Sequence, residues 1–135
     1  MGRIMAIDYG RKRTGIAVTD SLQIAAHGLS TLPTAQLMDF LKNYLVEEEV
    51  ETIVVGLPHH PDGKPSSNAD EIVRFSENLK KSLGIDIVLF DESYTSKDAR
   101  TLILASGAKK KKRRDKGLVD KIAAVLILQQ YLNHI

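Results

Sequence analysis

Two short apolar segments, separated by a polar turn that contains glycine, open the chain and constrain its fold more than any other feature. Residues 3–8 and 14–19 are apolar and extended in character, and they predict a β-hairpin. A third short strand is predicted near residues 27–32, ended by Pro33, because residues 20–26 are too few for a helix and a crossover. Three antiparallel strands are therefore expected at the start of the fold.

Helical and extended patterns alternate after these strands. Thr34 is expected to cap the first helix, and Gly84 to end the second in a left-handed conformation. The alternation predicts an α/β fold, a mixed sheet with helices on its faces, in a single domain over residues 1–135. The expected elements are a helix with apolar positions 37, 41, 44 and 45, a strand at 52–56, a helix capped by Ser66 or Ser67 and ending at 83, a strand at 85–90, a short helix from 95 to 107, and a helix from 117 or 118 to 132.

Cysteine is absent from the chain, which excludes disulfides, thiolate metal sites and a cysteine nucleophile. A bound metal would need oxygen or imidazole ligands. The first residues lack the apolar stretch of a signal peptide, and the longest apolar run, residues 122–128, is far too short to span a membrane. We therefore expect a cytoplasmic protein that has no membrane partner.

Positive charge is concentrated in one segment. Residues 109–116 contain seven basic residues and one acidic residue, for a local charge of +6, whereas the whole chain carries +2 and its remainder −4. Such a run is either a solvated surface or a patch that binds nucleic-acid phosphates without choosing a sequence. Charge alone does not decide between these two interpretations.

Carboxylates stand at the ends of several predicted elements. Asp8 ends the first strand, and Asp91 and Glu92 follow the strand at 85–90, at the edge where open α/β sheets place ligand sites. Asp120 lies near the start of the most apolar helix. Each acid alone is compatible with a structural role in a turn, a solvated loop or a helix N-terminus. Together, acids on three elements suit Mg²⁺ or Mn²⁺, and two such ions could activate a water for phosphoryl displacement.

Other catalytic arrangements have less support. His59 and His60 are adjacent in a loop, which is more typical of solvent-facing residues than of a metal site, so we interpret them as substrate contacts at most. Neither a nucleophile elbow nor a P-loop sequence is present. Gly10 and Gly15 would let a backbone or a phosphate approach closely, and Arg11, Lys12 and Arg13 between them could meet an anionic substrate.

Four motifs occur in order along nearly the whole chain. They read DYGRKRTGIA at residues 8–17, IVVGLP at 53–58 with Asp-Gly at 62–63, DESYTS at 91–96, and KGLVD at 116–120. Each motif alone is weakly specific, whereas four in this order and at these spacings are specific. In this combination the chain resembles the YqgF/RuvX family, ribonuclease H-like proteins related in fold to Holliday junction resolvases.

The resemblance implies a ribonuclease H-like fold, with a five-stranded mixed sheet of three antiparallel and then two parallel strands, flanked by about four helices. It implies a catalytic site at Asp8, Glu92 and Asp120 that binds one or two Mg²⁺ or Mn²⁺ ions. The implied activity is a nuclease that matures the 5′ end of pre-16S rRNA, or, in an older view of the family, one that resolves Holliday junctions in branched DNA. The candidate substrate-binding residues are Lys12, Arg13, Lys109, Lys110, Lys111, Lys112, Arg113 and Arg114.

Two positions depart from the family pattern. Ser93 stands where the family usually has Arg, and Lys121 where it usually has Ser. The first change removes a partner for phosphate or carboxylate, for which Arg100 or residues 109–116 could compensate.

Two other classes of function stay open. One is an actin-like or sugar-kinase ATPase, which the length of the chain disfavours because such proteins enclose the nucleotide between two lobes. The other is a non-catalytic RNA-binding module of ribosome assembly, in which the acids are structural. The sequence does not choose between RNA and DNA, or between a monomer and a homodimer.

Overall fold

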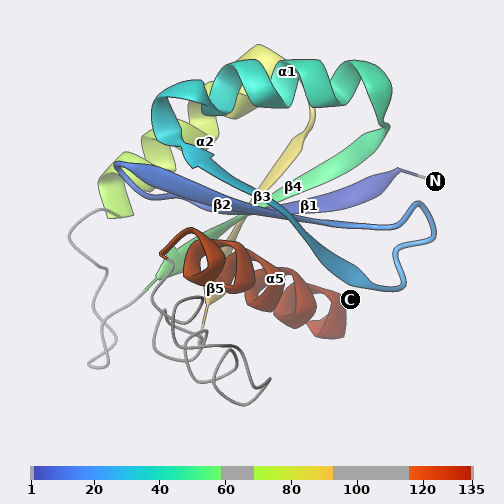
Figure 1. Cartoon of the computed structure of the whole chain (residues 1–135). Helices are drawn as coiled ribbons and strands as arrows, with labels where there is room; N and C mark the ends of the chain where they lie inside the picture. The colour runs from blue at the N-terminus through green and yellow to red at the C-terminus, as the bar shows by residue number, and fades with distance from the viewer. Residues whose placement is uncertain (1, 59–68, 93–115, 135) are drawn as a thin grey trace.

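The computed structural model describes residues 2–58, 69–92 and 116–134, and Figure 1 shows how their helices and strands are arranged. Within these ranges only the backbone is described at 58, 91–92, 116–119 and 133–134. The short helix expected at 95–107 lies outside the described residues. The elements are β1 (Arg3–Asp8), β2 (Arg13–Thr19), β3 (Ala26–Pro33), the 3-10 helix η1 (Thr34–Gln36), α1 (Leu37–Glu47), β4 (Val50–Pro58), α2 (Ala69–Leu83), β5 (Asp86–Glu92) and α5 (Lys116–His134).

The strands form one mixed sheet with β1 at its centre. Their order is β3-β2-β1-β4-β5. The pairs β1–β2 and β2–β3 are antiparallel, whereas β1–β4 and β4–β5 are parallel. The predicted sheet of three antiparallel strands followed by two parallel ones is therefore confirmed. None of the described helices is long and apolar enough to cross a membrane.

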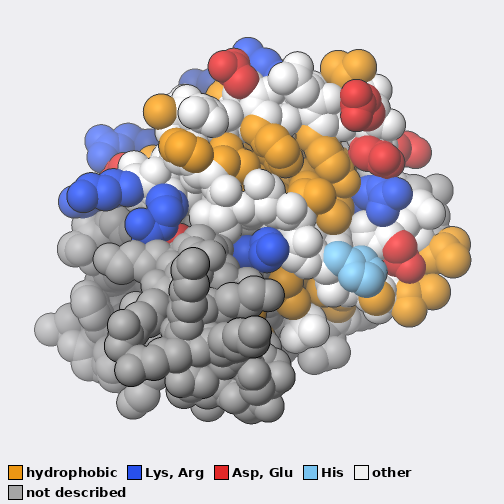
Figure 2. Space-filling view, in the orientation of Figure 1, with side chains coloured by type: hydrophobic (Ala, Val, Ile, Leu, Met, Phe, Trp, Pro, Cys, Tyr) orange, Lys and Arg blue, Asp and Glu red, His pale blue; other side chains and the backbone are white. Residues whose placement is uncertain are grey.

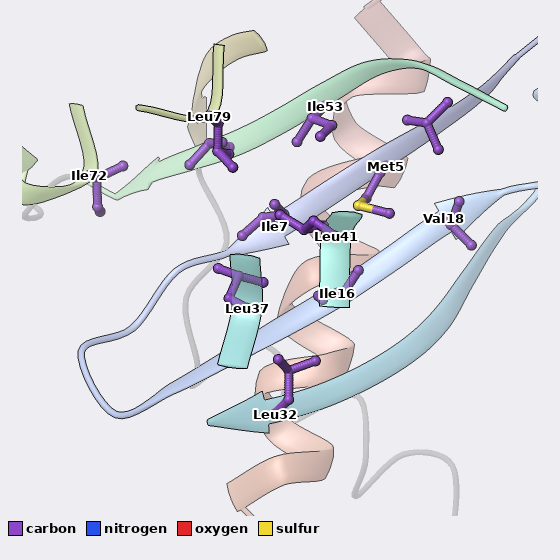
Figure 3. Packing of buried hydrophobic residues seen from close by; sticks show 12 residues of the cluster. Met5, Ile7, Ile16, Val18, Leu32, Leu37, Leu41, Ile53, Ile72 and Leu79 are labelled. Atoms are coloured by element: carbon purple, nitrogen blue, oxygen red, sulfur yellow. The ribbon is translucent and has the colours of Figure 1, made fainter. Parts of the chain in front are cut away.

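Helices cover both faces of this sheet. α1 and α2 lie on one face and α5 lies on the other (Figure 1). Met5 and Ile7 of β1 pack with the apolar residues of α1 and α2 (Figure 3), whereas Ile4 and Ala6 pack with those of α5. Because successive side chains of a strand point to opposite faces, Asp8 belongs to the α5 face.

The α1 and α2 layer is held by large apolar side chains. Leu37 and Leu41 of α1, and Ile72 and Leu79 of α2, are each at most 1% exposed. Each such side chain contributes about 1.5–3 kcal/mol on burial. α2 ends before Gly84, whose φ of +65° is the predicted left-handed stop. This packing fixes α2 relative to the strands.

Thr34 holds the connection between β1 and β2. The sequence predicted this residue as a helix cap, and that prediction was wrong: η1 begins at Thr34 and α1 begins at Leu37, without a side-chain cap in either helix. Instead, the Thr34 hydroxyl donates a hydrogen bond to the carbonyl oxygen of Gly10 at 2.5 Å and lies 2.9 Å from the Thr14 hydroxyl. Its backbone N–H donates to the carbonyl oxygen of Lys12 at 3.0 Å. The hydroxyl is therefore committed to the turn that follows Asp8.

α5 lies directly against the sheet backbone at two glycines. A Cβ atom on Gly15 of β2 would overlap the carbonyl oxygen of Asp120, so the helix can approach only because no side chain is present there. On β3, a Cβ atom on Gly28 would lie 2.8 Å from Cγ of Lys121. The close approach expected at Gly15 is thus made by the backbone of α5.

Gly15→Ala is expected to destabilise the fold, because the new methyl group would overlap backbone atoms of α5 that cannot rotate away. We expect a loss of about 2–3 kcal/mol in the free energy of unfolding, measured by urea denaturation. Gly28→Ala is the matched control, because its methyl group meets the flexible Lys121 side chain. For Gly28→Ala we expect the free energy of unfolding to change by less than about 1 kcal/mol. Equal stability of the two variants would contradict the packing of α5 on Gly15.

Candidate active site

Asp8 is the last residue of the central strand and lies on the α5 face. It is opposite Gly15 in the antiparallel pairing of β1 with β2. Its position in the strand has the same parity as Ile4 and Ala6, which pack against α5. The side chain is partly buried. The strand therefore presents this carboxylate at the rim of a packed apolar layer.

Asp120 reaches the same place from α5. It lies in the second turn of the helix, and its carbonyl oxygen rests on Gly15, the residue paired with Asp8. Its side chain is 20% exposed. The missing side chain at Gly15 therefore brings together two acids that are far apart in the sequence.

The two carboxylates repel each other. Burial, and after it the negative charge of Asp120, raise the pKa of Asp8 from 3.8 to about 7. Asp120 has a counter-ion, because Nε of Arg13 donates a hydrogen bond to its Oδ2 at 2.9 Å. The carboxylate of Asp8 has no such cation among the side chains that the structure describes. Near neutral pH, Asp8 is therefore partly protonated when no cation is bound.

Glu92 lies at the same edge of the sheet. It ends β5 and pairs with Pro58, the last residue of β4. The sequence placed the end of this strand at Phe90, whereas the strand continues through Glu92. Because parallel strands have their carboxyl ends at one edge, the backbone brings Glu92 to the edge where Asp8 stands, with β4 between them. The Glu92 side chain lies outside the described part of the structure.

The paired acids suit a hard divalent cation. Mg²⁺ and Mn²⁺ take carboxylate oxygens as ligands, and a positive charge near Asp8 and Asp120 would offset the burial and the repulsion that raise the pKa of Asp8. Three or more acidic or histidine side chains grouped to hold a metal are not found among the described residues. A third protein ligand would therefore have to come from a side chain beyond them, and Glu92 is the one that the sequence indicates.

A second cluster holds the turn after Asp8 against α2. Glu71 accepts a hydrogen bond from the Tyr9 hydroxyl at 3.1 Å on Oε1 and one from Nε of Arg11 at 2.9 Å on Oε2. The Tyr9 ring stacks on Phe75, one helical turn further along α2, with ring centroids 4.4 Å apart. We call Tyr9, Arg11 and Glu71 the turn clamp. Sequence reasoning missed Glu71, whose only local signal is its helical spacing from Phe75.

The turn clamp keeps Glu71 ionised. The hydrogen bond from Arg11 is the largest influence that lowers the pKa of Glu71, and the Tyr9 hydroxyl and the charge of Arg74 lower it further against the opposing effect of desolvation. Desolvation, and then the hydrogen bond to Glu71, raise the pKa of the Tyr9 hydroxyl. Glu71 therefore acts as an acceptor for both partners over the physiological pH range.

The predicted substrate-binding residues fall into two groups. Lys12 is exposed on the turn after Asp8, and Arg13 is bound to Asp120. The other candidates lie outside the described residues, and so do the two adjacent histidines: Lys109, Lys110, Lys111, Lys112, Arg113, Arg114, His59 and His60.

Comparison with known proteins identifies relatives that match nearly the whole chain. A family model described as "RuvX: Holliday junction resolvase" matches residues 2–134. A Bacteroides fragilis protein named "Putative pre-16S rRNA nuclease" is 50% identical over 133 residues, which are 98% of this chain and 96% of the relative. A protein of the same name from Porphyromonas gingivalis is 50% identical over 135 residues, 99% of this chain and 98% of the relative.

Two solved structures share the fold at low sequence identity. The fowlpox virus Holliday junction resolvase is 11% identical, with a TM-score of 0.57 over 98% of this chain and 99% of that chain. T. thermophilus RuvC, solved in complex with a Holliday junction substrate, is 16% identical, with a TM-score of 0.54 over 99% of this chain and 96% of that chain. These similarities confirm the resolvase-like, ribonuclease H-like fold that the sequence motifs implied. Together with the family match over residues 2–134, the relatives show that this chain belongs to the RuvX family.

Proposed function

We propose that this chain is a metal-dependent nuclease that hydrolyses phosphodiester bonds in nucleic acid. The observation that carries the proposal is the contact of α5 with Gly15, which brings Asp8 and Asp120 together. Among the described side chains, Arg13 pairs with Asp120 and no cation pairs with Asp8. Membership of the RuvX family and the names of the relatives support a nuclease. Glu92, whose backbone ends β5 at the same edge, is the proposed third ligand.

In the proposed mechanism, Asp8, Glu92 and Asp120 hold Mg²⁺ or Mn²⁺, as one ion or two. Such an ion, when bound, makes the attacking water more acidic and neutralises charge at the scissile phosphate. The rigid central strand keeps the Asp8 carboxylate in place, and α5 brings Asp120 to it. Arg13 fixes the orientation of the Asp120 carboxylate through Nε. Lys12, exposed on the adjoining turn, offers a positive charge to the substrate backbone.

We propose the 5′ end of pre-16S rRNA as the substrate. The names of relatives that are 50% identical over nearly the whole chain support this choice. Branched DNA is the second candidate, because the description of the matched family and the two structural neighbours refer to Holliday junctions. Side-by-side digestion of a precursor rRNA fragment and a four-way DNA junction with Mn²⁺ separates the candidates. Binding of RNA without cleavage under any divalent cation would favour the non-catalytic module of ribosome assembly.

Asp8→Asn is expected to abolish Mg²⁺- or Mn²⁺-dependent cleavage and to leave the fold intact, because the change removes a charged oxygen ligand without changing the size of the side chain. The initial rate of cleavage of a labelled rRNA fragment measures the effect, and circular dichroism checks the fold. Asp39→Asn is the matched control, because Asp39 is exposed on α1. Full cleavage by the Asp8→Asn protein would refute the role of Asp8.

Asp8→Asn is also expected to stabilise the metal-free protein at neutral and higher pH. The folded-state pKa of about 7 lies above the ordinary value of 3.8. The folded state therefore binds this proton more tightly than the unfolded state, and the free energy of unfolding falls as the pH rises from about 4 to about 7. Asparagine does not ionise, so the free energy of unfolding of the variant should exceed that of the wild type by about 4 kcal/mol near pH 8 and by little near pH 4.

Thermal denaturation in EDTA at both pH values measures this difference. After the EDTA is removed, added Mn²⁺ should raise the melting temperature of the wild type more than that of the variant, because a ligand stabilises the state that binds it. A metal-free wild type that is more stable than the variant at every pH would contradict the unfavourable burial of the Asp8 charge.

Replacing Lys109, Lys110, Lys111 and Lys112 with Gln is expected to weaken nucleic-acid binding and to flatten its salt dependence. For each phosphate that these lysines no longer neutralise, the slope of log Kd against log salt should fall by about 0.7 for a single strand. Fluorescence anisotropy with labelled RNA over a range of salt concentrations measures the slope. Replacing Lys80 and Lys81 with Gln, which removes two exposed positive charges at the end of α2, shows the effect of charge lost elsewhere on the surface. An unchanged slope would mean that these four lysines do not contact phosphates and belong to a solvated surface.

A further inference from the structure

Two arginines beside Asp8 share one arrangement. Nε of Arg11 donates to Glu71 and Nε of Arg13 donates to Asp120, each at 2.9 Å. In both cases the bond uses Nε, and the terminal nitrogens of the guanidinium have no hydrogen-bond partner among the described residues. The side chains are 68% and 43% exposed. An arginine that is bound through Nε keeps its two terminal nitrogens, which can donate hydrogen bonds to a phosphate.

The two guanidinium groups lie on opposite sides of the sheet. Arg11 contacts α2 and Arg13 contacts α5, and these helices cover opposite faces (Figure 1). Lys12, between them, is exposed. Figure 2 shows Lys and Arg side chains gathered at the end of the molecule that carries the β1–β2 connection. A phosphate backbone that crosses this end near Asp8 would therefore meet positive charge on both sides of it.

Stability alone does not account for the turn clamp. An ion pair as exposed as Arg11 and Glu71 contributes little to folding, because water and salt screen it. A second positive charge, that of Arg74, also acts on Glu71, so the negative charge of Glu71 is shared between two arginines. Both carboxylate oxygens of Glu71 are used by residues of the turn that follows Asp8. The consequence of the contact is a fixed direction for the Arg11 guanidinium.

We propose that Arg11 binds a phosphate of the substrate strand on the α2 side of Asp8, and that Glu71 is the positioning residue that orients Arg11 for this contact. The inference rests on the proposed function, since it takes the substrate to be a nucleic acid. It adds a subsite on the face of the sheet opposite Asp120. The strand then passes over the turn, with Arg11 on one side of Asp8 and Arg13 on the other.

The role of Glu71 can be separated from a simple charge effect. Removing a negative charge beside a phosphate site should tighten nucleic-acid binding if only long-range electrostatics matter. Removing the acceptor that orients Arg11 should weaken binding, because the guanidinium then loses rotational freedom on complex formation. The two explanations predict opposite signs for Glu71→Gln.

The experiment measures the affinity of a fluorescein-labelled single-stranded RNA in EDTA, where metal-dependent cleavage cannot occur. Arg11→Gln should weaken binding about fivefold and lower the salt slope by about 0.7. Glu71→Gln should weaken it about threefold, and Arg11→Lys should fall between wild type and Arg11→Gln because it keeps the charge without the planar fork. The double variant should bind no worse than Arg11→Gln alone, because the two residues act as one unit.

Two further variants keep the result interpretable. Glu77→Gln, an exposed acid on the same helix, should leave binding unchanged or slightly tighter. Tyr9→Phe removes the other hydrogen bond to Glu71 but leaves the bond of Arg11 to Oε2, so it should weaken binding by less than Glu71→Gln does. Melting temperatures verify that each variant is folded.

The outcomes distinguish the inference from the proposed function. If the wild type binds RNA and Glu71→Gln binds as tightly or more tightly, Glu71 does not position Arg11 and the inference is overturned. If Arg11→Gln retains both affinity and salt slope, the phosphate subsite is overturned while the proposed nuclease stands. If the wild type binds neither the labelled RNA nor a four-way DNA junction, the proposed function and the inference fail together.

Discussion

The contact between the α5 backbone and Gly15 is the interaction on which the site depends. It places Asp120 beside Asp8, and burial first and the charge of Asp120 second make ionised Asp8 costly in free energy, which its raised pKa reflects. That cost is on the order of a few kcal/mol near neutral pH, whereas each buried apolar side chain contributes about 1.5–3 kcal/mol. Ile127 and Leu128 of α5 are both at most 1% exposed. Apolar burial along the helix is therefore large enough to hold the like charges in place.

The sheet and the positions of the acids could be predicted from sequence, because both follow from local patterns. Short apolar runs with brief connections leave few arrangements for the first strands, and alternation with helices predicts the parallel ones. Asp8 and Glu92 were placed correctly at strand ends, although β5 extends past the predicted boundary through Glu92 itself. Gly15 was expected to permit a close approach. What approaches it could not be predicted, because α5 lies far along the chain.

Thr34 and Glu71 show where local reasoning stops. Thr34 fits the pattern of a helix cap, and Glu71 fits that of an acid in the first turn of a helix. In the fold, each of them bonds to the same short connection after Asp8: Thr34 to the carbonyl oxygens of the turn, and Glu71 to its side chains. In both cases the residue fits a role at the start of a helix, whereas its side chain bonds to a segment that is distant in the sequence. The turn beside the acids is thus restrained by partners that no spacing in the sequence connects to it.

The order of the elements along the chain has a consequence for synthesis. Asp8 belongs to the first strand and Asp120 to a helix that follows all five strands. On the ribosome, the hairpin that carries Asp8 is made early, whereas its contact with α5 at Gly15 can form only after that helix has emerged. The sheet and the acid pair are therefore assembled at different times. A partly translated chain has Asp8 but not Asp120, so the pairing of these two acids marks a completed fold.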